Sequence, residues 1–253
     1  MIDVFTGLFL SLLAGLATVI GGLIVFFIKK PKDAYLAFAL AFSTGVMLTV
    51  SFLELLPAGI LSVGYTYGLI VFFAGAAFAF LIDYVVPHRF IMEDATGNKD
   101  FDPKLFRVGM FVALGMAIHN FPEGFAVFAG SLQSIGLGIT IAVAIAIHNI
   151  PEGIAVAIPV YYATKKKAKA LFISFLSGIT EPIGALIGAL ILLPFLSAQV
   201  IGASLALVAG IMVYICIDEL MPAAFACARG KAHLMTFAFL LGSIVMGTAL
   251  ILI

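Results

Sequence analysis

Two six-residue stretches of the same pattern hold the side chains of this chain that are best suited to chemistry. They read HNFPEG at residues 119–124 and HNIPEG at residues 148–153. Each lies in the middle of a long apolar run, and the residues on either side also match. Because imidazole, amide and carboxylate groups are costly to place in hydrocarbon, their presence inside such runs indicates a functional site.

On a helix, each stretch places its polar side chains on one face. His119 and Glu123 are four residues apart and Asn120 and Glu123 are three apart, and these spacings bring side chains together on an α-helix. Pro122 has no backbone donor, so it would kink the helix and free the carbonyl of Ile118 for a cation or a water molecule. The second stretch repeats the arrangement with His148, Asn149, Pro151 and Glu152.

The two stretches together offer two imidazoles, two amides and two carboxylates, and Glu181, just before Pro182, adds a third carboxylate. This mixture suits borderline divalent cations such as Zn²⁺, Fe²⁺ and Mn²⁺ rather than Na⁺ or K⁺, and the lack of a thiolate in the set argues against Cu(I). Three carboxylates in a dry interior need counter-charge. No Lys or Arg lies in the predicted spans, so metal ions or protons must supply it, and two divalent ions bridged by carboxylates would do so.

Composition places the chain in a membrane. It has 253 residues, of which 64% are hydrophobic and 10% charged, with a mean hydropathy of +1.25, whereas a soluble domain has about 25% charged residues. The formal net charge is zero, which leaves no electrostatic footprint for nucleic acid. No GxxxxGK motif occurs, so ATP-driven pumping is not supported. Cys216 and Cys227 are interpreted as apolar packing residues rather than a disulfide.

Eight apolar segments are long enough to span a bilayer, which takes roughly 20 residues. A backbone in lipid must satisfy its own hydrogen bonds, so each segment is predicted to be a helix, and the first is interpreted as a retained helix rather than a signal peptide. The predicted fold class is an all-α polytopic membrane protein, with the whole chain, 1–253, as a single transmembrane domain. The predicted segments are 4–28, 34–58, 66–86, 108–130, 135–160, 170–194, 198–222 and 233–253.

The basic residues predict the orientation of these segments. All 13 fall in the first, third, fifth and seventh loops, and the other loops have none. Under the positive-inside rule the basic loops are cytoplasmic and both termini are extracytoplasmic. The basic residues, loop by loop, are Lys29, Lys30 and Lys32; Arg89, Lys99, Lys104 and Arg107; Lys165, Lys166, Lys167 and Lys169; and Arg229 and Lys231.

Parts of the chain resemble one another. SLLAGLATVIGGLI at 11–24 matches SFLSGITEPIGALI at 174–187 at half of its positions, and 45–57 shares Gly, Met, Glu, Leu and Pro with 210–222. The predicted orientation runs the matching segments in opposite directions. We therefore predict an inverted repeat that relates the first three segments to the last three, around a central pair formed by the fourth and fifth. Such repeats with Pro-interrupted polar helices are typical of secondary transporters, with the site near the midplane.

Glu54 and Glu219 occupy matching places in this repeat, near the ends of their segments. They either line or gate an ion path or cap neighbouring helices near the interface. The remaining candidates are interpreted as residues without a role at the site, with Met47 as filler rather than a soft ligand, Asp83 as interfacial, and His88 and His233 as loop residues.

With HNFPEG and HNIPEG on successive predicted helices, followed by SGITEP at 177–182, the chain resembles the ZIP family of divalent-metal transporters, most of all its prokaryotic ZupT-type branch. The resemblance covers the whole chain and implies eight helices, termini outside and a binuclear midplane site. It also implies a homodimer, as many members form, and an elevator-like cycle in which helices 1, 4, 5 and 6 move against the others. The metal ligands that it implies are His119, Asn120, Glu123, His148, Asn149, Glu152 and Glu181.

We therefore predict a secondary transporter that carries Zn²⁺, and also Fe²⁺, Mn²⁺ or Cd²⁺, across the plasma (inner) membrane into the cytoplasm. The expected partners are the metal ion as substrate, membrane lipid and a second copy of the chain, with no catalytic cofactor and no nucleic acid. The ligands must be deprotonated to bind metal, so transport should weaken at acidic pH.

Two other classes of protein compete with this prediction. The first is an intramembrane metal-dependent hydrolase, with His119 and His148 as zinc ligands and a glutamate as general base. It is disfavoured because no HExxH motif occurs and a proline lies inside each stretch. The second is a structural or sensor protein in which the polar side chains only pack helices together. The repeated set and the third carboxylate argue against it.

Overall fold

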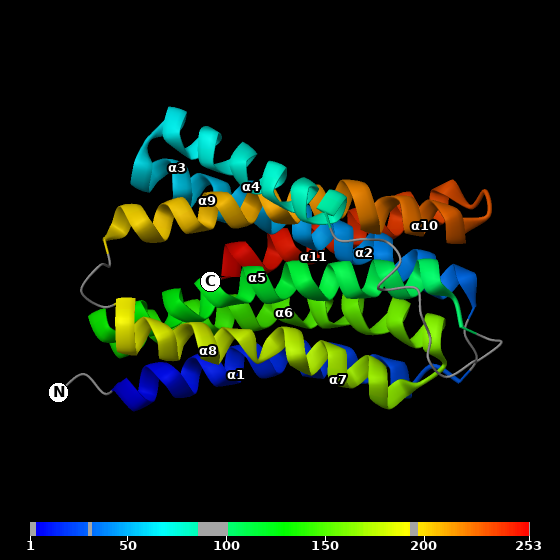
Figure 1. Cartoon of the computed structure of the whole chain (residues 1–253), viewed down its shortest axis with the longest axis horizontal. Coiled ribbons are helices and arrows are strands. Elements are labelled where there is room, and N and C mark those ends of the chain that lie inside the picture. The colour runs from blue at the N-terminus through cyan, green and yellow to red at the C-terminus, as the bar shows by residue number, and fades with distance from the viewer. Residues whose placement is uncertain (1–3, 30–31, 86–100, 193–196, 253) are drawn as a thin grey trace.

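The computed structural model describes residues 4–29, 32–85, 101–192 and 197–252, and these form an all-helical bundle (Figure 1). Eight helical spans within these ranges are long and apolar enough to cross a membrane, which confirms the predicted fold class. Residues 87–100 of the loop between the third and fourth predicted segments lie outside the described residues, and with them His88, Arg89 and Lys99. Lys30 also lies outside them.

Several spans combine more than one helical element. The elements in chain order are α1 (Val4–Gly22) with the 3₁₀ turn η1 (Leu23–Phe26), α2 (Asp33–Val50) with the π-helical segment η2 (Ser51–Leu55) and α3 (Leu56–Val63), α4 (Tyr65–Val85), α5 (Pro103–Gln133), α6 (Ile135–Thr164), α7 (Lys167–Gly178) with α8 (Thr180–Ile187) and the π-helical segment η3 (Gly188–Leu192), α9 (Ala198–Ile215) with the π-helical segment η5 (Cys216–Leu220) and α10 (Met221–Ala228), and α11 (Ala232–Leu252).

Local chemistry explains where the central helices begin. Asp102 caps α5 by accepting a hydrogen bond from the backbone N–H of Leu105, and Ser134 caps α6 in the same way through Leu137. Such caps satisfy backbone donors that have no partner in the first turn of a helix. Because α5 begins at Pro103 rather than at residue 108, Lys104 and Arg107 belong to a helix and not to a loop, contrary to the prediction.

The second and seventh spans continue past the prolines near which they were predicted to end. The second reaches Val63 and the seventh reaches Ala228. In both, a π-helical segment precedes the proline, so Pro57 and Pro222 each fall in the first turn of a new α-helix. Proline is tolerated there because it does not need to donate a backbone hydrogen bond. The two matching stretches share this feature, while the inverted direction of the repeat stays a prediction.

The helices pack as two groups. The first bundle consists of α1, α5, α6, α7 and α8, and the second bundle consists of α2, α3, α4, α9, α10 and α11. Figure 1 shows the first bundle in the lower part of the view and α3, α4, α9 and α10 in the upper part. The bundles meet where α2 packs on α6 and where α5 packs on α9. At the first of these contacts, the Ser43 hydroxyl donates a hydrogen bond to the Pro151 carbonyl at 3.1 Å.

The glycine that closes each six-residue stretch allows helices of the first bundle to approach closely. A Cβ atom at Gly124 would overlap the backbone carbonyl of Glu181, and one at Gly184 on α8 would overlap the backbone of α5. The same reciprocal approach joins α6 and α1 at Gly153 and Gly21. Small residues at helix contacts are typical of membrane bundles. Here they bring the backbone that carries Glu181 against the first stretch.

We expect Gly124→Ala to destabilise the protein, because the added methyl group must displace the α8 backbone. Overpacking of this kind costs about 1–3 kcal/mol, so the temperature of unfolding in detergent should fall clearly. Gly136→Ala is the matched control, since nothing lies within 4 Å of a Cβ there. Equal unfolding temperatures for the two variants would contradict the close approach of α5 and α8.

Candidate metal centre

Four charged or ionisable side chains of α5 and α6 meet in the interior. His119 and Glu123 lie on α5, His148 and Glu152 lie on α6, and none is more than 2% exposed. His119, His148 and Glu152 each offer one ligand atom within 4.8 Å of the others. The matching motifs on two adjacent helices therefore bring their imidazoles and carboxylates to one place, which we name the imidazole cluster.

Glu123 links the two imidazoles of this cluster. Its Oε1 lies 3.0 Å from Nε2 of His119 and 2.9 Å from Nε2 of His148. The His148 contact has hydrogen-bond geometry, so one proton lies between Nε2 of His148 and Oε1 of Glu123. Nε2 of His119 also lies 3.4 Å from Oε1 of Glu152, but it has no hydrogen-bond geometry toward either carboxylate.

Asn149 contacts Glu181, and Asn120 contacts the backbone of Ser177, four residues before Glu181; we name these three side chains the amide cluster. The Asn149 amide donates to Oε2 of Glu181 at 2.8 Å and to the backbone carbonyl of Ala14 at 3.0 Å. The Asn120 amide donates to the carbonyl of Ser177 at 3.0 Å. Backbone carbonyls can only accept hydrogen bonds, so these contacts fix the orientation of both amides. The side-chain oxygens of Asn120 and Asn149 remain available to another partner.

Many ligand atoms at the centre have no hydrogen-bond partner among the described residues. Leaving a buried polar atom without a partner costs about 1–3 kcal/mol, and such atoms are few in native proteins. Here they concentrate in one place, and the oxygens are acceptors without donors, which is the environment that favours a cation. These oxygens are Oδ1 of Asn120, Oδ1 of Asn149, Oε2 of Glu123, both carboxylate oxygens of Glu152 and Oε1 of Glu181.

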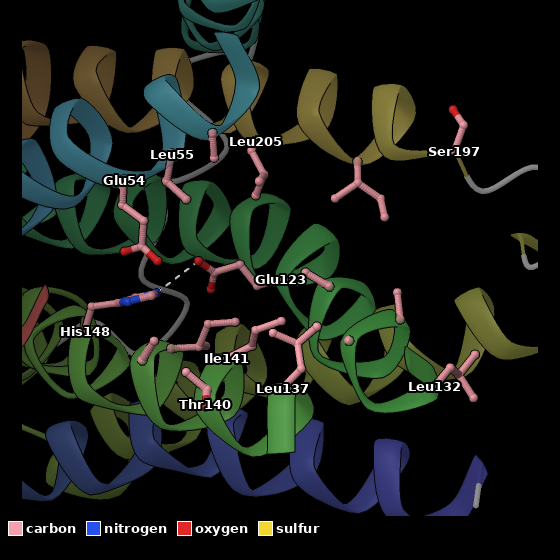
Figure 2. A pocket seen from close by; sticks show the side chains of 17 residues that line it. Glu54, Leu55, Glu123, Leu132, Leu137, Thr140, Ile141, His148, Ser197 and Leu205 are labelled. Carbon is pink, nitrogen blue, oxygen red and sulfur yellow. Dashed lines mark hydrogen bonds and ion pairs between the residues drawn. The ribbon is translucent and has the colours of Figure 1, made fainter. Parts of the chain in front are cut away.

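A cavity of about 720 Å³ reaches the imidazole cluster from one side, between the two bundles. Figure 2 shows Glu54, Glu123 and His148 together at one end of the cavity, with Leu132 and Ser197 toward the other. We name this cavity the vestibule. Its mouth lies at the ends of the helices where the turns carry no basic residue. Both motifs therefore have a path to one face of the molecule.

The structure places Glu54, Met47 and Glu219, whose roles the sequence left open, in three different environments. Glu54 lines the vestibule, whereas Met47 is fully buried in the apolar core and does not line it. Glu219 is buried on the other side of the centre, 3.6 Å from a guanidinium nitrogen of Arg107. Cys216 and Cys227 are free thiols, as predicted.

Arg107 is the residue with the largest structural role that sequence reasoning missed. It was assigned to a loop, yet it lies in α5 and its Nη2 is 2.6 Å from Oδ1 of Asp83 on α4. Asp83, Asp218 and Glu219 could group one oxygen each within 4.8 Å. The guanidinium already supplies the counter-charge to two of them, so we do not assign a metal site there. The place of Arg107 immediately before the predicted start of the helix at residue 108 was the available signal.

Eight apolar helices packed around a buried set of imidazoles, amides and carboxylates define a multi-pass membrane protein with a polar centre. The model of the family described as ZIP Zinc transporter matches residues 92–250. The chain belongs to this family and is of its ZupT type. It is therefore a transporter and not an enzyme, and the hydrolase alternative is not favoured.

Similarity to curated relatives extends over the full chain. It is 47% identical to a protein named Zinc transporter ZupT from Chlorobium phaeovibrioides, over 100% of both chains. It is 45% identical to the protein of that name from Akkermansia muciniphila, over 96% of this chain and 95% of the relative. The Campylobacter jejuni protein of the same name is 42% identical, over 98% and 96%.

If the centre binds a divalent cation, Zn²⁺ should raise the unfolding temperature of the purified protein, because a ligand at 100 times its Kd stabilises the folded state by about 2.7 kcal/mol. We expect His148→Ala to abolish this shift and His233→Ala, at an exposed position on α11, to retain it. The shift should also shrink as pH falls, since protons compete for the same ligand atoms. An undiminished shift in His148→Ala would contradict the assignment.

Proposed function

We propose that this protein is a secondary transporter that moves Zn²⁺, and the related ions Fe²⁺, Mn²⁺ and Cd²⁺, across the plasma membrane into the cytoplasm. The observation that carries the proposal is the concentration of unpartnered, buried polar atoms in the two clusters, which the vestibule reaches at Glu123 and His148. The relatives named as zinc transporters support Zn²⁺ as a substrate.

The ligands of the proposed site are the seven residues of the two clusters. One ion binds in the imidazole cluster, where the proton now shared between Glu123 and His148 would be displaced. A second ion binds at the amide cluster, through the free oxygens of Asn120, Asn149 and Glu181. Glu152, with both oxygens unpartnered, bridges the two. Two divalent ions would neutralise the three carboxylates, which supports a binuclear site. The weakly binding amides favour release.

The proposed direction of transport follows from charge and access together. The vestibule opens toward the turns that carry no basic residue, and the connections at the other ends of the helices carry Lys165, Lys166 and Arg229. The positive-inside rule assigns that basic side to the cytoplasm. The described ends of the chain, Val4 and Leu252, then lie on the extracytoplasmic side, from which the metal enters.

Contacts between the bundles close the opposite side. Arg107 of the first bundle pairs with Asp83 and Glu219 of the second. The Tyr162 hydroxyl donates to the backbone carbonyl of Lys32 at 3.1 Å and accepts from its N–H at 3.0 Å. Release of the ion to the cytoplasm would break these contacts between the bundles. The seven proposed ligands would stay together, because all seven lie in the first bundle. A rigid movement of this bundle against the second, as in an elevator, meets both requirements.

The outer surface of the molecule bears on two further proposed partners, membrane lipid and a second copy of the chain. Large apolar side chains such as Phe27, Leu61 and Ile251 are at least 80% exposed. A surface of this kind is suited to lipid, which we propose as the surrounding medium. A homodimer through part of this surface is proposed on the family resemblance alone.

Transport is tested by Zn²⁺ influx into proteoliposomes that contain a metal-sensitive dye. We expect saturable influx for the wild type and a loss of at least about a hundredfold for Glu152→Gln, because this substitution removes a buried ligand charge without changing side-chain size. Asp33→Asn, at an exposed carboxylate that pairs with Arg229, should transport normally. Equal influx through Glu152→Gln and the wild type would remove the central site from the mechanism.

The inner closure is tested through Cys216, which is fully buried and lies three residues from Glu219. A partly exposed ion pair contributes up to about 1 kcal/mol, so Arg107→Gln should increase the population open to the cytoplasm about fivefold. In a Cys227→Ser background, we expect a membrane-impermeant maleimide to label Cys216 faster by this factor from the cytoplasmic side.

Lys104→Gln is the matched control, because it removes a positive charge from the same end of α5 at an exposed position. It should label at the wild-type rate. An unchanged rate in Arg107→Gln would show that its ion pairs do not hold the inner side closed.

A further inference from the structure

Glu54 differs from the seven proposed ligands because it comes from the other bundle. It lies on the π-helical segment η2, between α2 and α3, whereas the ligands lie on α5, α6 and α8. π-Helical turns interrupt α-helices frequently at functional sites. Figure 2 shows the Glu54 carboxylate pointing toward His148 and Glu123 across the end of the vestibule.

The Glu54 carboxylate has a buried oxygen that could accept a positively charged partner. Its Oε2 is buried and has no hydrogen-bond partner among the described residues, and Glu123 carries an unpartnered Oε2 at the same end of the vestibule. No Lys or Arg lines the vestibule among the described residues. Two facing carboxylates that share a single imidazole, His148, and have no Lys or Arg beside them create a local negative potential that concentrates cations.

We propose that Glu54 is a loading ligand for the divalent cation. It binds the ion in the vestibule together with Glu123 and His148, before the ion passes fully into the imidazole cluster. This inference rests on the proposed function, and it adds an eighth ligand that belongs to the second bundle. Because Glu54 cannot follow the first bundle, its bond to the ion must break when the site turns inward. Glu54 therefore acts on capture of the ion and not on its retention.

Glu219 provides an internal comparison for this assignment. It occupies the matching place in the repeat, on the π-helical segment η5 and three residues before a proline, as Glu54 does. Glu219 has a guanidinium partner, Arg107, at 3.6 Å, whereas no Lys or Arg among the described residues pairs with Glu54. Of the two matching carboxylates, the one on the open side of the structure is thus free to bind a cation.

The test compares initial rates of Zn²⁺ influx over a range of Zn²⁺ concentrations, with Zn²⁺ titrations of the same purified proteins. We expect Glu54→Gln to raise KM about tenfold with kcat within about twofold of the wild type, and to weaken equilibrium binding by a similar factor. Glu54→Asp, which keeps the charge, should lie between the two. Thr140→Val removes a polar group from the same vestibule and should match the wild type.

A second variant separates direct binding from general attraction. Ala58 lines the vestibule one helical turn beyond Glu54, so Glu54→Gln/Ala58→Glu restores the charge at a displaced position. We expect KM to stay raised at least fivefold. Full recovery of KM would show that any nearby negative charge suffices, and would overturn the ligand assignment.

The outcomes separate this inference from the proposed function. Wild-type KM and affinity in Glu54→Gln would overturn the loading role while leaving transport intact, and so would a fall in kcat with unchanged KM. Absence of influx in the wild type would overturn the proposed function, and the titrations would still decide whether Glu54 binds the ion. If Glu54→Gln fails to fold, a wild-type KM in Glu54→Asp, whose carboxylate is drawn back from His148, would overturn the inference.

Discussion

The burial of several carboxylates in an apolar interior is the constraint on which the rest of this structure depends. Glu123, Glu152 and Glu181 are at most 2% exposed. Among the described residues no Lys or Arg forms an ion pair with them, and the Arg107 guanidinium pairs with Asp83 and Glu219 instead. Such charges persist in a low-dielectric interior only with partners of opposite charge. Protons on the imidazoles offer partial compensation, and divalent cations offer more.

Close helix packing at glycines and the fixed orientation of two amides give the site around these carboxylates its shape. Gly124 and Gly153 let α8 and α1 approach the two motif helices, and these neighbours supply the Glu181 carboxylate and the Ala14 carbonyl. Because backbone carbonyls accept from the amide groups, the side-chain oxygens of the asparagines are left without a hydrogen-bond partner. The seven proposed ligands all lie in the first bundle.

The division into two bundles gives the matching carboxylates different environments. Glu54 faces an open vestibule and Glu219 lies in a closed ion-pair network, although both follow the same local pattern of a π-helical turn before a proline. The difference comes from Arg107, which reaches from one bundle to the other. The structure therefore presents one of the matching carboxylates at an open cavity and the other buried beside a guanidinium.

The sequence by itself determined the all-helical membrane fold, the eight spans and the grouping of His119 with Glu123 and of His148 with Glu152, because hydrophobic length and helical spacing are local properties. It did not reveal that α5 begins early enough to include Arg107, since Asp102 starts the helix through a cap inside a polar stretch. Nor could it distinguish Glu54 from Glu219, whose local sequences are alike. Only the tertiary structure decided those points, because the partner of a buried charge is set by which distant helices pack against it.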